Sequence, residues 1–270
     1  MDNRRLGFVG AGNMAEAMCR GILKAKLYAP SAILAADIAE ARRRWFQDEL
    51  GVRAAPDAVS VIRESDVVIL AVKPQHMGEV LREIGPLARA DQTLISIAAG
   101  VPTKRIEDAC AAEVRVVRVM PNTPMLIGRG MSAVCGGRLA GDQDIQTAVA
   151  VCEAAGRAVV VEEQDMDVVT AVSGSGPAYF FFLVERMIEA GVAEGLTAET
   201  AAVLAKQTAL GAAELVLASE DPPEELRRRV TSPGGTTEAA FKLLQERGGF
   251  RDWVDAVRRA AVRSRELAAG

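Results

Sequence analysis

The residues best suited to chemistry stand late in the chain, in Ser232-Pro233-Gly234-Gly235-Thr236-Thr237, just before a helical pattern. Pro233 ends the element before it, and the two glycines let the backbone approach a ligand closely. We expect Thr236 or Thr237 to cap the next helix, whose first turn then presents N–H groups at its positive end. This arrangement suits a small anion such as a carboxylate, although an ordinary helix–loop–helix turn has the same composition.

A second group of residues suited to binding lies near the N-terminus, where Leu6-Gly7-Phe8-Val9 is followed by Gly10-Ala11-Gly12-Asn13-Met14-Ala15. This is a G-x-G-x-x-A pattern at a strand-to-helix turn, and an acidic residue, Asp37, ends the next strand about 20 residues further on. The first glycine makes the turn, the second admits a pyrophosphate, and the small third residue lets helix pack on strand. The combination predicts dinucleotide binding.

Asp37 bears on which dinucleotide is bound. A carboxylate at this position accepts hydrogen bonds from the ribose hydroxyls of NAD and repels the 2′-phosphate of NADP. An alternative is that Asp37 caps the following helix, which would still allow a ribose contact. Arg42, Arg43 and Arg44 follow and could reach a phosphate, but their position is more typical of a solvated helix face.

Three further turns close successive strand-like runs, and each carries polar, Gly or Pro residues. They are Ala71-Val72-Lys73-Pro74-Gln75, Ser96-Ile97-Ala98-Ala99-Gly100 and Val119-Met120-Pro121-Asn122-Thr123-Pro124. Strand ends at the carboxyl edge of a parallel sheet face the ligand crevice, so we expect the three turns to share a cofactor site. Taken singly, Lys73 could be a surface lysine and the prolines mere turn residues.

The elements that must position these residues change character near Glu163. Before it, short apolar runs alternate with helical patterns, which predicts a doubly wound parallel sheet. The expected strands are Leu6–Val9, Ile33–Ala36, Val67–Val72, Thr93–Ile97, Val114–Val119, Met131–Val134 and Ala158–Val161, and helices include Asn13–Lys26, Ala39–Leu50 and His76–Ala88. After it, only helices are expected, at Ala178–Ala193, Ala198–Ser219 and Phe250–Ala269. We therefore predict an α/β dinucleotide-binding domain of the Rossmann type over residues 1–162 and an all-α dimerisation domain over residues 163–270.

The helix Ala178–Ala193 is apolar on almost every side and rich in Phe. A helix of that kind must be buried, and one small helical domain would struggle to cover it. We expect a partner subunit to share the core, giving a homodimer; the alternative is a compact bundle that buries the helix alone.

Composition excludes several classes of function. The net charge of −4 gives no bulk basic character for nucleic acid, and no apolar run approaches the roughly 18 residues that a membrane span needs. The N-terminus leaves no room for a signal peptide, and four separated cysteines suit a reducing compartment, so we expect a cytoplasmic protein. His76 is the only histidine, which argues against a His-based triad or a two-His metal site, and no metal is expected.

Together these motifs resemble the pyrroline-5-carboxylate reductase family. The resemblance runs nearly end to end and rests on Gly10–Ala15, Ala71–Gln75, Met120–Pro124, Ser173–Tyr179 and Ser232–Thr237, in the family's order. It implies a Rossmann domain, a helical domain that interlocks with a second subunit, and dimers that family members often assemble into a decamer. It also implies hydride transfer from NADPH or NADH to the C=N carbon of 1-pyrroline-5-carboxylate, an imino acid, giving L-proline.

By the same resemblance, Ser232, Gly234 and Gly235 hold the substrate carboxylate, and Thr237 is the catalytic residue that hydrogen-bonds the ring nitrogen. Glu163 is placed near the same site. The expected cofactor-binding residues are Gly10, Ala11, Gly12, Asn13, Met14, Ala15, Asp37, Ala71, Val72, Lys73, Pro74, Ala98, Gly100 and Asn122.

One residue departs from the family's pattern. Many members follow the second strand with small polar or basic residues that suit NADPH, whereas this chain has Asp37, which leaves NADH plausible or preferred. Two other functions stay open. A β-hydroxyacid dehydrogenase would place a catalytic lysine on the long helix, and Pro177–Gly195 contains none. A non-enzymatic dinucleotide-binding regulator would leave Ser232–Thr237 idle.

Overall fold

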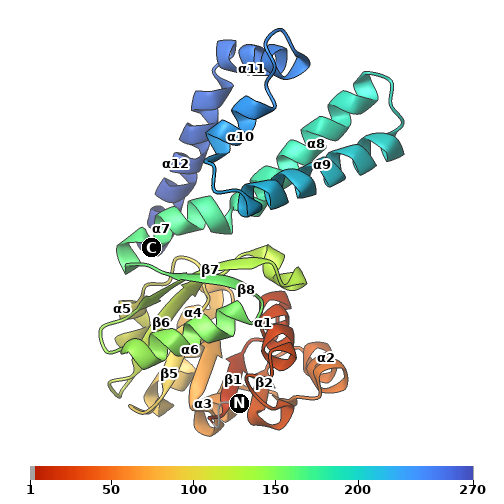
Figure 1. Ribbon diagram of the computed structural model, residues 1–270. Coiled ribbons are helices and arrows are strands. Elements are labelled where there is room, and N and C mark those ends of the chain that lie inside the picture. The colour runs from red at the N-terminus through yellow and green to blue at the C-terminus, as the bar shows by residue number, and fades with distance from the viewer. Residues whose placement is uncertain (1–3, 270) are drawn as a thin grey trace. The chain divides into compact units, whose positions relative to one another are not determined.

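The computed structural model describes residues 4–269, and the chain divides into two compact units (Figure 1). Unit 1 comprises the described residues up to Ser175 and those from Ala260 onward, and unit 2 runs from Gly176 to Arg259. The long C-terminal helix therefore begins in unit 2 and ends in unit 1. The domain boundary expected between residues 162 and 163 stays a prediction.

Within the described residues, unit 1 is organised around an eight-stranded sheet with the order β3-β2-β1-β4-β5-β6-β7-β8 (Figure 1). Its strands are β1 (Leu6–Val9), β2 (Ile33–Ala36), β3 (Arg53–Ala55), β4 (Val67–Leu70), β5 (Thr93–Ser96), β6 (Arg115–Met120), β7 (Gly130–Gly136) and β8 (Gly156–Val160). Neighbouring strands are parallel except β6 and β7. The chain from Met120 to Gly130 is shorter than a parallel crossover needs, so β7 turns back along β6. The predicted α/β fold class is confirmed. The expectation of a wholly parallel sheet is corrected, because β7 is antiparallel to β6.

Helices cover both faces of the sheet, as a doubly wound fold requires. They are α1 (Asn13–Lys24), α2 (Glu40–Leu50), α3 (Ala58–Glu64), α4 (Pro74–Ile84), α5 (Thr103–Glu107), α6 (Asp142–Glu153) and α7 (Met166–Val169). Short turns of helix are η1 (Pro30–Ala32), η2 (Gly85–Leu87), η3 (Thr123–Ile127), η4 (Glu163–Asp165) and the π-helix η5 (Thr170–Gly174). One apolar cluster joins α1, α2 and α6 to the sheet, and a second joins α3, α4 and α5 to its other face. This explains why the strands are apolar at consecutive positions.

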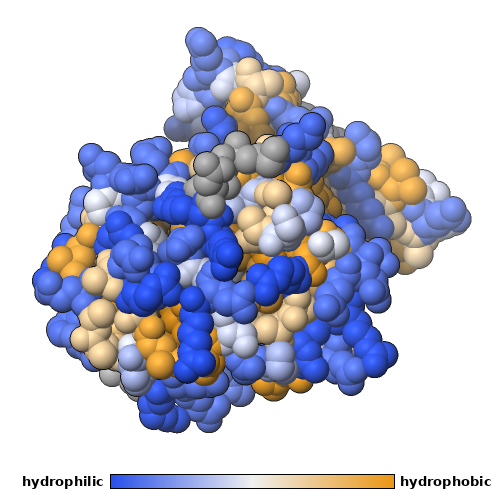
Figure 2. Space-filling view, turned by 90° about the horizontal axis from the view of Figure 1, so that it is seen from below, coloured by the Kyte–Doolittle hydropathy of each residue, from blue (hydrophilic) through white to orange (hydrophobic). Residues whose placement is uncertain are grey.

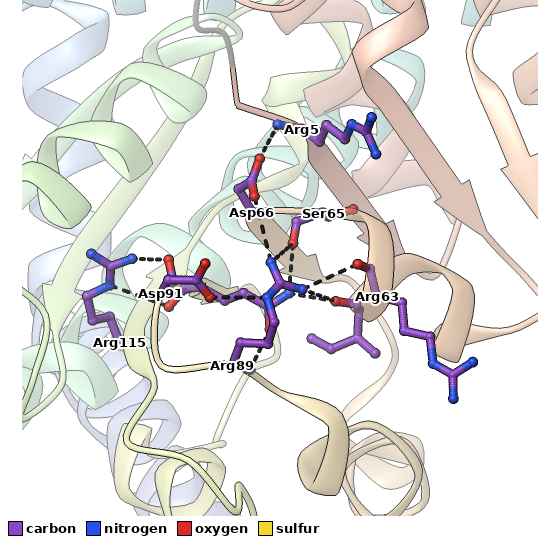
Figure 3. A network of polar contacts seen from close by, with 9 residues as sticks. Arg5, Arg63, Ser65, Asp66, Arg89, Asp91 and Arg115 are labelled. Atoms are coloured by element: carbon purple, nitrogen blue, oxygen red, sulfur yellow. Dashed lines mark hydrogen bonds and ion pairs between the residues drawn. The ribbon is translucent and has the colours of Figure 1, made fainter.

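A polar network around Arg89 lies at the amino ends of the strands (Figure 3). Arg89 donates from Nη1 to the carbonyl oxygen of Ile62 at 3.2 Å and from Nη2 to that of Ser65 at 3.3 Å. Asp66, directly before β4, accepts from the N–H of Arg5, directly before β1, at 2.8 Å. Hydrophilic residues dominate the surface of unit 1 in the view of Figure 2, with apolar residues scattered among them. The network around Arg89 ties together the amino ends of β1 and β4.

Unit 2 is helical, as predicted. Its helices are α8 (Gly176–Ala193), α9 (Ala198–Ala218), α10 (Pro223–Arg229), α11 (Thr236–Glu246) and the first part of α12 (Gly249–Ala269). Large apolar side chains are exposed along α8 and α9, among them Phe180, Phe181, Phe182, Leu183, Val203, Leu204 and Leu217. Such a patch on a single chain marks an interaction surface.

The apolar helices correct one expectation from the sequence. By length and composition alone, the segments Glu163–Ala193 and Ala198–Ala218 are long and apolar enough to cross a membrane. These segments carry a few polar residues among many apolar ones, so no continuous apolar run marks them in the sequence. Within these segments, α8 and α9 carry exposed apolar side chains, and a partner subunit that covers them would account for their composition.

Candidate functional site

The turn after β1 has the backbone that the first glycine motif requires. Gly10 has φ of +98°, and a Cβ at this position would lie 2.8 Å from the carbonyl oxygen of Ala71, so only glycine fits. Gly12 is different, because no described atom lies within 4 Å of the place where its Cβ would be. Gly12 is also the N-cap of α1 and makes no side-chain cap. The turn thus presents the N-terminus of a twelve-residue helix beside open space, which suits a pyrophosphate.

Asp37 lies against this turn. Its Oδ2 accepts a hydrogen bond from the N–H of Ala11 at 2.8 Å, and its Oδ1 accepts one from the N–H of Ala39 at 2.9 Å. The N-cap of α2 is Ala39, so the alternative that Asp37 is the N-cap is wrong. The carboxylate instead connects the end of β2 with the glycine turn, at the position where a ribose would be recognised.

Arg42 also reaches the turn, which corrects its placement on a solvated face. Its Nε donates to the carbonyl oxygen of Ala11 at 2.7 Å, and its Nη2 donates to Oε2 of Glu16 at 2.9 Å. Arg43 donates from Nη1 to the carbonyl oxygens of Asp37 at 2.7 Å and Ile38 at 3.0 Å. Sequence reasoning missed these contacts, since a run of arginines on a helix does not reveal which one faces a loop 31 residues away.

The other three predicted turns follow β4, β5 and β6, which lie in that order on one side of β1 in the sheet. Lys73 is the exposed N-cap of α4, Pro74 is the first residue of that helix, and Ala71 and Val72 are half-buried. Ala98 is buried, and Gly100 has φ of +70°. The structure therefore brings the predicted cofactor residues of these turns and of Gly10–Ala15 to one edge of the sheet.

Asn122 joins the last of these turns to the segment before α8. Its Nδ2 donates to the carbonyl oxygen of Ser173 at 3.2 Å and to Oγ of Ser173 at 3.3 Å. Its Oδ1 accepts from the N–H of Met131 at 2.8 Å. The side chain thus fixes where the small-residue segment at Ser173 lies relative to the sheet edge, a link that the sequence alone did not suggest.

Glu163 lies in unit 1, at the start of η4, and both of its carboxylate oxygens are engaged. Thr103 donates from its N–H to Oε1 at 2.8 Å and from its hydroxyl to Oε2 at 2.6 Å. Buried Arg118 lies 3.4 Å from Oε1. Since Ser232–Thr237 belongs to unit 2, the placement of Glu163 near a substrate site stays a prediction.

The Ser232–Thr237 loop has the turn that its glycines predict. Gly234 has φ of +71°, and the N–H of Gly235 donates to the carbonyl oxygen of Ser232 at 2.9 Å. The N-cap of α11 is Gly235, without a side-chain cap, so the expectation that Thr236 or Thr237 caps the helix is wrong. Both threonines lie in its first turn, where Thr236 is exposed and Thr237 half-buried.

Neighbouring groups hold this loop within unit 2. Oε2 of Glu238 accepts from the N–H of Gly234 at 2.7 Å. The guanidinium of Arg227 lies 5.3 Å from the ring centroid of Phe241 on α11 and 5.8 Å from that of Phe250 on α12. These cation–π contacts attach α10 to the two helices that follow it.

The four cysteines are free thiols without the character of a nucleophile. Burial raises the pKa of Cys19, Cys135 and Cys152 to about 12 each, and that of half-buried Cys110 to about 11. Such thiols stay protonated at neutral pH, and reactivity requires the thiolate. The cysteines therefore lack the thiolate that a nucleophile would need.

Comparison with known proteins identifies the family. Residues 163–267 match the family described as pyrroline-5-carboxylate reductase dimerisation, and residues 5–100 match the one described as NADP oxidoreductase coenzyme F420-dependent. A pyrroline-5-carboxylate reductase of Methanosarcina acetivorans is 42% identical over 267 residues, which cover 99% of each chain. The chain belongs to the pyrroline-5-carboxylate reductase family. A reductase of this family from Glycine max is 41% identical over 97% of this chain and 95% of its own.

Solved structures of the family have the same architecture over the full length. A pyrroline-5-carboxylate reductase from Coxiella burnetii has a TM-score of 0.91 and 34% identity, with 99% of each chain covered. One from Plasmodium falciparum, solved with NADP bound, has a TM-score of 0.89 and 30% identity, again with 99% of each chain covered. The resemblance read from the motifs is confirmed.

Proposed function

We propose that this chain reduces the C=N bond of 1-pyrroline-5-carboxylate with NADH or NADPH and releases L-proline, the last step of proline biosynthesis. The observation that carries this proposal is the 42% identity to a pyrroline-5-carboxylate reductase over 99% of both chains. Reduction of a cyclic imine needs a positioned hydride donor and a proton for the nitrogen, without a covalent enzyme intermediate. Orientation then supplies much of the rate, and the dinucleotide carries the chemistry.

The residues at the carboxyl edge of the sheet fit a dinucleotide. The space beside Gly12 is open, and the first turn of α1 has no side-chain cap. We propose that Gly10–Ala15 bind the pyrophosphate, that Asp37 binds the adenosine ribose, and that the turns carrying Ala71–Pro74, Ala98, Gly100 and Asn122 line the rest of the site. When bound, the reduced nicotinamide supplies the hydride.

The same proposal assigns the substrate to Ser232–Thr237. The hydroxyl of Ser232 and the N–H groups of Gly234 and Gly235 bind its carboxylate, aided by the positive end of α11. In the structure these two N–H groups donate to Glu238 and to the carbonyl oxygen of Ser232, so the substrate must replace or share those partners. Thr237 is the catalytic residue, and its hydroxyl hydrogen-bonds the ring nitrogen, which gains a proton as the neighbouring carbon gains the hydride. Glu163 has the weakest support as a substrate residue, because Thr103 and Arg118 already engage its oxygens.

We propose that the cofactor preference follows Asp37. A carboxylate that faces the ribose accepts hydrogen bonds from its hydroxyls and repels a 2′-phosphate, so we expect NADH to be used well. The NADP-bound relative from Plasmodium falciparum is 30% identical and leaves this preference to be measured in this chain.

The chain acts on a small molecule as a homo-oligomer. We propose a homodimer that buries the apolar faces of α8 and α9, supported by the dimerisation match over residues 163–267. Assembly of dimers into a decamer, a cytoplasmic location, and the absence of nucleic-acid or membrane partners belong to the same proposal. So do the domain bounds at residues 1–162 and 163–270.

The decisive test is an assay of NADH and NADPH oxidation, side by side, with 1-pyrroline-5-carboxylate and the purified protein. Turnover with proline as product supports the proposal. A protein that binds proline or a dinucleotide but turns over neither cofactor would instead be a regulator. Turnover of a β-hydroxyacid without reduction of the imine would favour the dehydrogenase alternative.

A further inference from the structure

The backbone of Ala11, between the two glycines of the dinucleotide turn, is held on both sides by residues that follow β2. Its N–H donates to Oδ2 of Asp37 at 2.8 Å, and its carbonyl oxygen accepts from Nε of Arg42 at 2.7 Å. Ala11 itself is fully buried, although Gly12 beside it is exposed. These two hydrogen bonds reach the centre of the turn from outside it.

The side chain of Arg42 is itself tightly placed. Its Nη2 donates to Oε2 of Glu16 on α1 at 2.9 Å. Its guanidinium lies 5.0 Å from the ring centroid of Trp45 and 5.6 Å from that of Phe46. Its side chain is 29% exposed. Arg42 therefore connects three elements: the glycine turn, the first turns of α1 and the aromatic residues of α2.

A glycine turn needs such support from outside. Glycine has more backbone freedom than any other residue, so the N–H groups of Gly10–Gly12 keep one direction only if neighbouring groups hold them. Binding that requires a flexible loop to be ordered is weaker by the free energy of ordering it. Each hydrogen bond from Arg42 involves a charged donor, and such bonds are stronger than neutral ones.

We propose that Arg42 is a positioning residue that sets the affinity for NADH and NADPH alike, by holding the Ala11 peptide and without touching the dinucleotide. The inference rests on the proposed function only in that the turn binds a dinucleotide. It separates the roles of two neighbours, because Asp37 discriminates between the two cofactors and Arg42 does not. Nε and Nη2 of Arg42 are already used within the protein, which distinguishes it from an arginine that reads a 2′-phosphate.

Arg20 provides a matched control. Its Nε donates to Oε1 of the same Glu16 at 3.2 Å, and its guanidinium lies 4.8 Å from the centroid of the same Trp45 ring. Both of these contacts are with residues of α1 and α2 and not with the glycine turn. Arg20→Met therefore removes a similar ion pair and a similar cation–π contact, and Arg42→Met removes in addition the hydrogen bond to Ala11 and the contact with Phe46.

The test is direct binding of NADH and NADPH to the full-length protein, followed by nucleotide fluorescence, for wild type, Arg42→Met, Arg42→Lys and Arg20→Met. We expect Arg42→Met to raise Kd for both cofactors by about tenfold, the size of one good charged hydrogen bond. Arg42→Lys keeps the charge but lacks the two-armed geometry, so an intermediate rise is expected. Arg20→Met should stay within twofold of wild type. At saturating cofactor, kcat and the KM for the imino acid should hardly change.

Other outcomes overturn the inference in distinguishable ways. Unchanged affinity in Arg42→Met shows that the turn needs no support from Arg42. A loss confined to NADPH shows that Arg42 reads the 2′-phosphate, and an equal loss in Arg20→Met shows a general packing effect. If Arg42→Met does not fold, Arg42→Lys with unchanged affinity for both cofactors overturns the inference. Wild type that binds neither cofactor refutes the dinucleotide site and the proposed function, whereas wild type that binds both but does not reduce the imine refutes the proposed function alone.

Discussion

The carboxylate of Glu238 accepts a hydrogen bond from the N–H of Gly234, over 2.7 Å. This N–H is one of the groups proposed to hold the carboxylate of the substrate. Glu238 lies in the first turn of α11, where a negative charge is favoured by the helix dipole. An internal carboxylate therefore occupies part of the proposed anion site, and the substrate must displace it to make the same contact.

We expect Glu238→Gln to lower the KM for 1-pyrroline-5-carboxylate two- to fivefold. The amide can still accept from Gly234 but no longer repels an anion, and exposed charges of this kind contribute about 0–1 kcal/mol. The loss of charge at the start of α11 should reduce Tm slightly. Steady-state kinetics with saturating cofactor measures the effect. Glu246→Gln, at the other end of α11, serves as a control, and a raised KM in Glu238→Gln would mean that Glu238 assists binding.

The sequence predicted well those features that repeat along the chain. Strands Leu6–Val9 and Ile33–Ala36 have the predicted bounds, because each is a fully buried apolar run. The edge strand β3 was missed, since it has three residues, one of them an exposed Arg. The strand predicted to reach Val72 ends at Leu70, where the chain turns toward α4. Local composition does not show where a strand stops pairing.

In the candidate site, too, the sequence predicted local backbone features but not the contacts between distant residues. Gly10 and Gly234 were predicted as special backbone positions, and both have positive φ. The threonine cap at α11 was wrong because Gly235 has the extended backbone of an N-cap, one residue earlier. The contacts of Arg42 with Ala11 and of Asn122 with Ser173 span 31 and 51 residues, respectively. Contacts over such separations depend on the packed fold and leave no signal in residue spacing.

Asp37 has two contacts that sharpen the test of cofactor choice. Because its Oδ2 also accepts from Ala11, Asp37→Ser removes a charge and, in addition, a support of the turn. We expect this variant to raise the NADPH-to-NADH ratio of kcat/KM by at least tenfold, with a lower absolute value for NADH. Asp37→Asn keeps an acceptor for Ala11 and removes the charge, so it should improve NADPH use with less loss. Identical ratios in all three proteins would show that Asp37 does not face the ribose.

The prediction of a homodimer can be tested at Leu183. This residue is 51% exposed in the single chain and lies among the exposed Phe residues of α8. Because this side chain is not part of the core of one chain, Leu183→Asp should leave each chain folded and prevent dimerisation. A charge transferred into an apolar interface without a partner costs several kcal/mol. Light scattering coupled to size exclusion measures the mass, and circular dichroism measures the fold. Leu183→Met keeps the apolar surface and should stay oligomeric, whereas an unchanged mass for Leu183→Asp would place the interface elsewhere.

The last prediction concerns Thr237, which lies half-buried in the first turn of α11. The substrate nitrogen gains a proton as the carbon gains the hydride, so a hydroxyl beside it should stabilise the transition state at least as well as the bound substrate. Thr237→Ala should lower kcat/KM by about one to two orders of magnitude, the size of one to two good hydrogen bonds. Thr237→Ser retains the hydroxyl and should keep most of the activity, and cofactor affinity should hardly change in either variant.

Thr236→Ala is the control. Gly235 is the N-cap, so the exposed Thr236 hydroxyl is not needed to cap the helix, and little change in stability or turnover is expected. If Thr236→Ala abolishes turnover and Thr237→Ala does not, the two roles are reversed, and if neither matters, Ser232–Thr237 is a turn and the substrate binds elsewhere.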